Sequence, residues 1–234
     1  MSKPHNHRSN RRLGDVNVLH EDDHLIIVNK PAGLLTVGTE SEKSHTLYAL
    51  LTDYVRRGNS KSKNRVFIVH RLDRDASGIV IFAKTESVKH QLQDHWDEVK
   101  KKYFVVVHGK CTTHHAIIES YLTENKAHRV YSTDDYSKGK LSRTAYKVIK
   151  TSGGLSLLEI ELLTGRKHQI RVHMADMGHP VVGDKYYGVK EHSHKHLVLH
   201  ALSIEFIHPV SGVQCKFEAP VPVYFDQLIG KKKE

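Results

Sequence analysis

A polar segment between two short apolar runs is the feature that most constrains this chain. Residues 66–69 and 79–83 are apolar and rich in β-branched side chains, which is typical of buried strands. The segment 70–78 between them (HRLDRDASG) carries a histidine, two arginines and two carboxylates. Buried strands on both sides would hold such a loop rigidly, so it is a candidate functional loop. A loop that is simply closed by an arginine–aspartate pair fits the same pattern.

The rest of the chain mixes strand and helix patterns irregularly. Helical spacing of apolar residues predicts helices over 46–57, 86–101 and 168–177. We expect strands at 25–28 and 103–108, and hairpins that join 143–150 to 155–163 and 197–207 to 214–219. Because strands and helices do not alternate regularly, a doubly wound parallel sheet is not expected. The sequence predicts an α+β fold, with a mixed, mostly antiparallel sheet flanked by helices.

Charge is concentrated at the two ends of the chain. The 234 residues carry a formal net charge of +10, and 38% of them are hydrophobic, which suffices for a globular core. We expect a basic flexible tail over 1–14, one catalytic domain over 15–228 and a basic C-terminal tail over 229–234. Basic tails suit a protein that binds a phosphate backbone, although many other soluble proteins carry them as well.

Several classes of protein and site are not expected. Apolar runs such as 103–107 are far shorter than the ~20 residues that span a bilayer, and residues 1–14 lack the apolar core of a secretory signal. Cys111 and Cys215 form no disulfide framework, which predicts a soluble protein of a reducing compartment, by default the cytoplasm. His192, His194 and His196 alternate and could bind a metal, but a solvated loop is the favoured interpretation, so no metal site is expected.

A second candidate segment, 163–173, joins a strand to a helix. Arg166 and Lys167 fall at the start of this helix, where the helix dipole disfavours cations. A bound anion would explain them, with Arg171 and His173 lining a phosphate-binding face, although side chains that extend into solvent would also fit. A third segment places Tyr103 after lysines at a strand start, where it could stack on a base or belong to the core.

Taken together, these segments resemble one family, the RluA-type RNA pseudouridine synthases. The resemblance rests on ordered motifs at 29–34, 70–73 with 77–78, 102–103, 164–173, 178–180 with 183–184, 199–201 and 218–220. It covers roughly residues 18–226. Family members often carry an S4-like RNA-binding domain ahead of the catalytic one, and here we expect the catalytic domain alone.

The resemblance implies an enzyme that isomerises specific uridines in structured RNA, either ribosomal or transfer RNA. Such enzymes break the bond between uracil N1 and ribose, rotate the base and rejoin it through C5, without a cofactor or metal. Asp73 would be the catalytic carboxylate, Tyr103 would stack on the flipped uracil and Arg166 would pair with Asp73. An adjacent guanidinium favours the ionised carboxylate that a nucleophile requires. Asp75, the rival carboxylate, is interpreted as solvent-facing or as a loop staple.

The resemblance also implies an RNA-binding surface on the catalytic domain. Arg71 would fill the gap that the flipped base leaves, since a planar guanidinium stacks well. Further RNA contacts are expected from Lys102, Lys167, His168 and Arg171.

One departure from the family pattern is Ala76, which stands where threonine is usual and could weaken a loop hydrogen bond. The loops at 58–64 and 124–142 are expected to select the RNA, and the family resemblance suggests a monomer. The alternative is a noncatalytic RNA-binding or RNA-folding protein on the same fold, which would have no need of Asp73. A plain basic globular protein would leave the ordered motifs unexplained.

Overall fold

The computed structural model describes residues 12–40, 42–189 and 194–230. The chain divides into two compact units. Unit 1 comprises Met1–Trp96 and Phe206–Ala219, and unit 2 comprises Asp97–Glu205 and Pro220–Glu234. The single catalytic domain expected over 15–228 stays a prediction, and most of the two expected tails lies outside the described residues.

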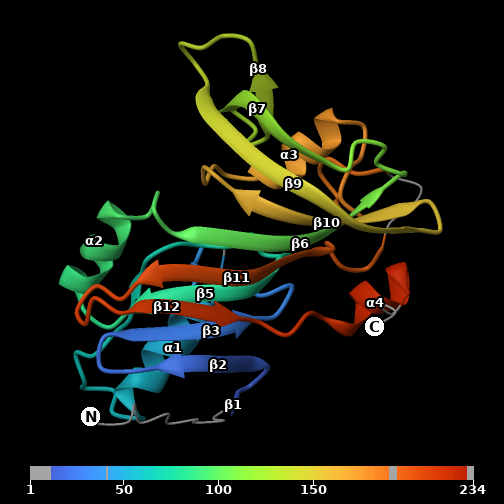
Figure 1. Ribbon diagram of the computed structural model, residues 1–234. Helices are drawn as coiled ribbons and strands as arrows, with labels where there is room; N and C mark the ends of the chain where they lie inside the picture. The colour runs from blue at the N-terminus through green and yellow to red at the C-terminus, as the bar shows by residue number, and fades with distance from the viewer. Residues whose placement is uncertain (1–11, 41, 190–193, 231–234) are drawn as a thin grey trace. The chain divides into compact units, whose positions relative to one another are not determined.

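Unit 1 is built on antiparallel strands in the order β1-β2-β3-β5 (Figure 1). Strand β4 also pairs with β5. Its elements are β1 Arg12–Leu13, β2 Val16–Glu21, β3 Leu25–Lys30, α1 Leu47–Arg56, β4 Phe67–Ile68, β5 Ser77–Ala83, α2 Glu86–Asp94 and β12 Gln214–Glu218. All seven residues of β5 are buried, as the continuous apolar run predicts for a strand covered on both faces.

Helix α1 follows its predicted bounds closely. The Thr46 hydroxyl accepts a hydrogen bond from the backbone N–H of Ala49 at 3.1 Å and caps the first turn. Leu47 and Leu51, on one helical face, are buried. The helix ends at Arg57, which adopts a left-handed conformation with φ of 52°.

Helix α2 is shorter than predicted. The expected helix over 86–101 ends at Asp94, and the next strand, β6, begins at Lys100. Trp96 lies beyond the helix, where its ring packs on the His70 ring at 4.7 Å between centroids. The helical spacing of apolar residues therefore extends past the true end of the helix. Trp96 fits this spacing, but it packs against His70 outside the helix.

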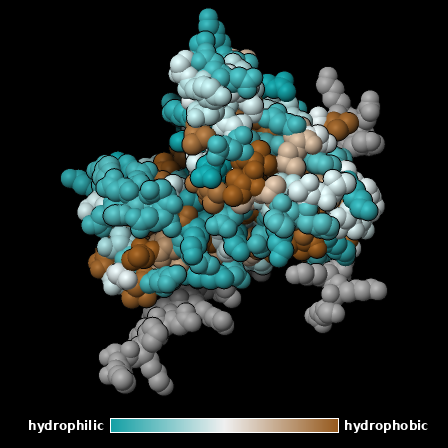
Figure 2. All heavy atoms as spheres, turned by 45° about the horizontal axis from the view of Figure 1, so that its top comes forward, coloured by the Kyte–Doolittle hydropathy of each residue, from teal (hydrophilic) through white to brown (hydrophobic). Residues whose placement is uncertain are grey.

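Unit 2 contains antiparallel strands in the order β11-β6-β10-β9-β7-β8. Its elements are β6 Lys100–His108, β7 His115–Glu124, β8 Val130–Thr133, β9 Lys140–Ser152, β10 Leu155–Leu162, α3 Gln169–Asp176, β11 Leu199–Ile207 and α4 Val223–Ile229. The last two residues of β11 belong to unit 1. In Figure 2 the surface at the end of unit 2 that holds β7, β8 and β9 is mostly hydrophilic.

The predicted β9–β10 hairpin is confirmed. Its turn passes through Gly153 and Gly154, which have φ of 57° and 75°, values that suit glycine. Helix α4 was not expected from the sequence. It follows Pro222, and its residues Phe225 and Ile229 are buried in a core cluster with Val106, Val182 and Val198.

The α+β prediction is confirmed, since helices accompany antiparallel strands in each unit. Within the described ranges, no helix is both long and apolar enough to cross a membrane.

Candidate active site

In unit 1, a buried lysine ties the end of β3 to the loop that follows β4. The Lys30 ammonium is fully buried and donates hydrogen bonds to the carbonyl oxygens of Pro31 at 3.0 Å, Leu34 at 2.8 Å and Arg74 at 3.0 Å. The Arg74 carbonyl also accepts from the Gly33 N–H at 2.9 Å, and the Arg74 Nε donates back to the Gly33 carbonyl at 3.2 Å. Two loops far apart in sequence are therefore held as one.

Two further anchors hold the loop 70–76. The Thr36 hydroxyl donates to the Leu72 carbonyl at 2.9 Å and accepts from the Leu72 N–H at 3.2 Å. The His70 Nε2 accepts from the Ile81 N–H at 3.0 Å, which fixes the ring against β5. Leu72 and Ala76 are buried, so the usual threonine position is filled here by a packed methyl group. This loop is rigid at its start, middle and end.

The charged side chains of the same loop have different exposures. Arg71 is exposed, whereas Asp73 and Asp75 are half-buried. Burial lowers the pKa of Lys30 to about 7, and the charges of Asp73 and Asp75 oppose this shift. Both carboxylates therefore lie close enough to Lys30 to stabilise its positive charge.

In unit 2, β6 carries the predicted tyrosine. Tyr103 is half-buried and lies opposite Ile160 of β10 on one side and Ala201 of β11 on the other. Lys102, the preceding residue, forms an ion pair with Glu159, with 3.1 Å between Nζ and Oε1. The central position of β6 fixes the backbone at Tyr103.

The turn before α3 presents Arg166 on the surface of unit 2. Buried Gln169 organises this turn, because its Oε1 accepts from the Arg166 N–H at 3.0 Å and from the Thr164 hydroxyl at 2.9 Å. The Arg166 side chain is exposed, and its Nε donates to the Leu141 carbonyl at 3.4 Å. The guanidinium is thus presented from a fixed backbone.

Lys167, a cation at the start of α3, is paired with a carboxylate of the protein itself. Lys167 Nζ lies 2.5 Å from the Glu124 carboxylate and 3.2 Å from the His128 carbonyl. Lys167, with His128, lowers the pKa of Glu124. His168 occupies the N-cap position with φ of 54° and shares a hydrogen bond of 2.9 Å between its Nδ1 and the Tyr187 hydroxyl. An external anion is therefore not needed to explain Lys167.

The expected phosphate-binding face of α3 is buried. Arg171 forms a bidentate ion pair with Asp184 at 2.7 and 2.8 Å, and the two side chains are 7% and 0% exposed. Although burial alone would raise it, Arg171 holds the pKa of Asp184 below its usual range. His173 is fully buried between the hydroxyls of Ser120 and Thr144, so its place on a phosphate-binding face is wrong. Direct RNA contact by Arg171 stays a prediction, which this pairing does not favour.

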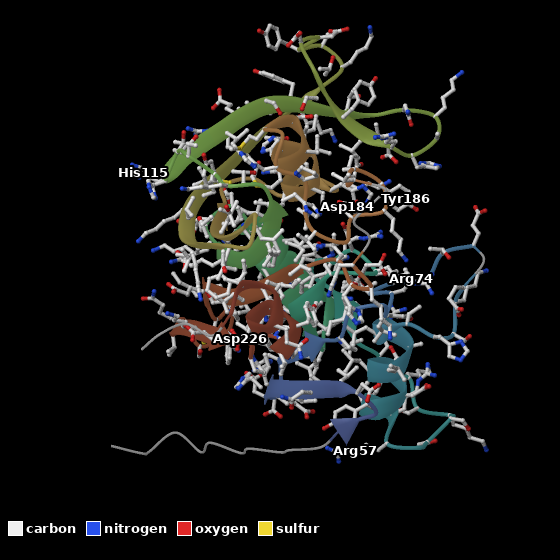
Figure 3. The ribbon with its side chains drawn as sticks, turned by 90° about the vertical axis from the view of Figure 1, so that its right-hand side faces the viewer. Arg57, Arg74, His115, Asp184, Tyr186 and Asp226 are labelled. Atoms are coloured by element: carbon white, nitrogen blue, oxygen red, sulfur yellow. The ribbon has the colours of Figure 1, made fainter. Side chains whose placement is uncertain are left out.

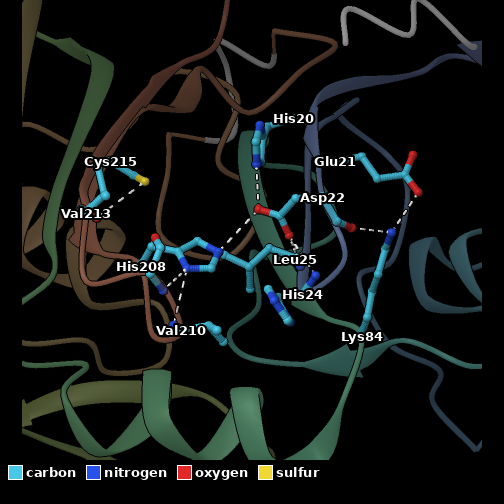
Figure 4. Close-up of polar contacts among 11 residues, drawn as sticks. His20, Glu21, Asp22, His24, Leu25, Lys84, His208, Val210, Val213 and Cys215 are labelled. Carbon is cyan, nitrogen blue, oxygen red and sulfur yellow. Dashed lines mark hydrogen bonds and ion pairs between the residues drawn. The ribbon is translucent and has the colours of Figure 1, made fainter. Parts of the chain in front are cut away.

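A polar centre that the sequence did not reveal lies elsewhere in unit 1 (Figure 4). The Asp22 Oδ2 contacts the Nε2 atoms of His20 at 2.9 Å and His208 at 3.2 Å. Its Oδ1 accepts from the N–H groups of His24 and Leu25, both at 2.7 Å. Although burial would raise it, these hydrogen bonds hold the pKa of Asp22 well below its usual range. The centre joins the β2–β3 turn to the segment 206–219 and has a structural role.

The histidine-rich stretch gives a local contact only. The His194 Nδ1 lies 2.9 Å from the His196 carbonyl oxygen, while His192 lies outside the described residues. In the part of the chain that the structure describes, no group of three or more His, Cys, Asp or Glu side chains could hold a metal ion. Cys111 and Cys215 are both free thiols.

Comparison with known proteins identifies the family. The family model described as RNA pseudouridylate synthase matches residues 24–176. The chain belongs to this family. It is 36% identical to the Uncharacterized RNA pseudouridine synthase YhcT of Bacillus subtilis, over 92% of this chain and 72% of the relative. It is also 36% identical to the Ribosomal large subunit pseudouridine synthase C of Rickettsia typhi, over 91% of this chain and 70% of the relative.

Solved structures of the family share the fold. The structure titled Human RNA Pseudouridylate Synthase Domain Containing 4 has a TM-score of 0.74 at 20% identity and covers 89% of each chain. That titled Human RNA Pseudouridylate Synthase Domain Containing 1 has a TM-score of 0.73 at 23% identity, over 90% of this chain and 85% of the other. The predicted resemblance is confirmed, and the protein is an RNA pseudouridine synthase, an enzyme that isomerises uridine in RNA.

Lys30 and Asp184 both lie in motifs of the sequence, but the sequence indicated no role for either side chain. The signal for Lys30 was its position at the end of a strand whose first four residues are apolar, since a buried ammonium there needs several acceptors. For Gln169, a polar residue that organises the turn at Arg166, no sequence signal distinguished a buried amide from an exposed one.

Proposed function

We propose that Asp73 is the catalytic carboxylate with which this enzyme isomerises uridine. The observation that carries the proposal is the anchoring of the Asp73 loop, through Lys30 to the Arg74 carbonyl and through Thr36 to Leu72. A nucleophile must be held within a fraction of an ångström of its productive position, and such a loop supplies this. Burial lowers the pKa of Lys30 to about 7 and the charge of Asp73 opposes this shift, which places the Asp73 carboxylate near the Lys30 ammonium.

In the proposed reaction Asp73 assists cleavage of the N1–C1′ bond, and the detached uracil rotates within the site. The C5–C1′ bond then forms, C5 loses its proton to solvent and N1 gains a proton, so that the product is an isomer of the substrate. Tyr103 stacks on the flipped base, and Arg166 pairs with Asp73 when RNA is bound. The exposed Arg71 fills the gap in the RNA stack.

The proposed substrate is large-subunit ribosomal RNA, because relatives that match most of this chain carry the name ribosomal large subunit pseudouridine synthase. Transfer RNA is the second candidate. The proposed RNA contacts are Lys102, Lys167, His168 and Arg171, of which Arg171 is the least accessible because it is paired with Asp184. We also propose a cytoplasmic monomer that requires no metal or cofactor.

Tritium release from RNA labelled at uridine C5 tests the proposal, since the isomerisation expels that hydrogen. Wild type, Asp73→Asn and the matched control Asp75→Asn are each incubated with ribosomal and transfer RNA pools. We expect release by wild type and by Asp75→Asn, and at least ~10⁴-fold less by Asp73→Asn, as for removal of other catalytic nucleophiles. Release by Asp73→Asn at the wild-type rate would refute the assignment. Tight RNA binding by wild type without any release would support the noncatalytic alternative.

A further inference from the structure

An exposed aromatic ring in unit 2 has no role in the proposed chemistry. Tyr186 is 64% exposed and lies in the tight loop 183–188, next to Asp184 (Figure 3). A Cβ atom at Gly183 would lie 1.9 Å from the His196 carbonyl oxygen, and one at Gly188 would lie 2.1 Å from the Asp184 carbonyl oxygen. The backbone therefore approaches so closely at both ends of the loop that only glycine fits there, and the Tyr186 ring projects from a tightly packed loop.

The ring is held from beneath by a buried ion pair. The Tyr186 N–H donates to Asp184 Oδ1 at 2.9 Å, and the Arg171 guanidinium carbon lies 5.5 Å from the ring centroid. Because Arg171 is buried whereas Tyr186 is largely exposed, the cation covers one side of the ring and leaves the rest to solvent. A pre-ordered aromatic side chain of this kind loses little conformational freedom when a flat ligand stacks on it.

A second tyrosine and a histidine pack beside the Tyr186 loop. Tyr187 accepts from the Val130 N–H at 3.1 Å, and its ring meets the His168 ring edge-on at 5.7 Å. The Arg129 guanidinium lies 5.4 Å from the Tyr187 ring centroid. His168 itself lies 6.2 Å from the Tyr186 ring and follows Arg166 by two residues. The exposed ring is thus adjacent to the turn that presents the proposed catalytic arginine.

The charges around this cluster suit a nucleic acid. Lys167, Lys185 and Arg129 are exposed cations, and Glu124 is paired with Lys167. Exposed aromatic rings among cations are the arrangement by which proteins bind unpaired nucleotides, with the ring on the base and the cations on the phosphates.

We propose that Tyr186 is a stacking platform for an unpaired base of the RNA substrate, a base that neighbours the reacting uridine. This proposal rests on the proposed function and adds to it a contact distinct from Tyr103, which belongs to β6. The platform would select RNA in which the nucleotide beside the target is unpaired, as in a loop or bulge.

Binding of a large-subunit ribosomal RNA fragment by Tyr186 variants tests the platform. We expect Tyr186→Ala and Tyr186→Leu to weaken binding about 10- to 100-fold, and Tyr186→Phe to bind as wild type. The leucine variant is the matched control, because it still covers the Arg171–Asp184 pair without offering a π face. The slope of log affinity against log salt should not change, since no phosphate contact is removed. Thermal unfolding verifies that each variant is folded.

Photocrosslinking locates the contact directly. The same RNA, substituted with 5-iodouridine outside the target site, is irradiated with wild type and with Asp73→Asn, and the crosslinked peptide is mapped by mass spectrometry. A crosslink at Tyr186 in both proteins supports the platform. Wild-type affinity of Tyr186→Leu, with no crosslink at Tyr186, would overturn it and leave the ring as a cover for the ion pair.

The two proposals fail separately. Tritium release by wild type, with no effect of any Tyr186 variant on RNA binding, would remove the platform alone. A crosslink at Tyr186 without tritium release by wild type from either RNA pool would overturn the proposed function, and the platform as a contact beside a reacting uridine would go with it.

Discussion

Replacement of Lys30 by methionine would separate the stability of unit 1 from the placement of Asp73. Methionine nearly matches the length of lysine but cannot donate, so the carbonyls of Pro31, Leu34 and Arg74 would each lose a partner. Each lost bond costs about 1–3 kcal/mol, or about 3–9 kcal/mol together. The substitution also removes the cost of burying an ammonium. For a pKa lowered from 10.5 to about 7, this cost is about 4 kcal/mol at pH 7, and it offsets part of the loss of hydrogen bonds.

The net change in the free energy of unfolding is therefore modest, between about 1 kcal/mol of stabilisation and about 5 kcal/mol of destabilisation. The catalytic effect should be larger than this figure suggests, because the Arg74 carbonyl belongs to the loop that carries Asp73. A displacement of a reacting group by about 1 Å can cost about 10²-fold in rate, so we expect kcat of Lys30→Met to fall by about that factor.

The assays are urea unfolding and tritium release at saturating RNA, which distinguishes kcat from KM. The matched control is Lys84→Met, which removes a partly buried ammonium that pairs with Glu21 at 2.9 Å in the same unit. We expect the control to lose stability but to keep the wild-type kcat. A wild-type kcat in folded Lys30→Met would refute the argument that this lysine positions the loop.

The pH dependence gives an independent measure of the same buried amine. Because the pKa of Lys30 is lower in the folded than in the unfolded state, unfolding takes up a proton between pH 7 and 10.5. The stability of wild type relative to Lys30→Met should therefore rise across this window, by up to about 5 kcal/mol, and level off below pH 7. A difference that is flat from pH 7 to 10 would show that the amine has an ordinary pKa.

Three further predictions concern other parts of the chain. Asp184→Asn leaves the Arg171 guanidinium buried without a counter-charge, so urea unfolding should show a loss of about 3–5 kcal/mol. Burial lowers the pKa of His173, so unfolding takes up a proton below pH 6.5, and acidification from pH 7 to 5 should destabilise wild type more than a folded His173→Gln; equal losses would contradict this. Arg71→Ala should keep the wild-type unfolding midpoint, since the side chain is exposed, but lower single-turnover tritium release about tenfold or more through impaired base extrusion.

Local sequence patterns differ from the structure where a residue contacts a distant part of the chain. The helical spacing after residue 86 continued through Val99, but the helix ends at Asp94 because Trp96 packs on the His70 ring. Helix α4 is short and was missed, since its two buried residues have meaning only against a core contributed by other elements. Periodicity indicates which residues share an apolar face, but it does not indicate which distant residues they will contact.

The sequence by itself determined the α+β class, the β5 strand, the hairpin around Gly153 and the family. These features depend on contiguous residues, whose polarity and backbone freedom are fixed locally. Only the tertiary structure decided that Lys30 reaches the Arg74 carbonyl, 44 residues away, and that Arg171 forms a buried ion pair with Asp184. From the sequence alone, Arg171 could face either solvent or the core, because its burial and its ion pair depend on the packing of the whole unit.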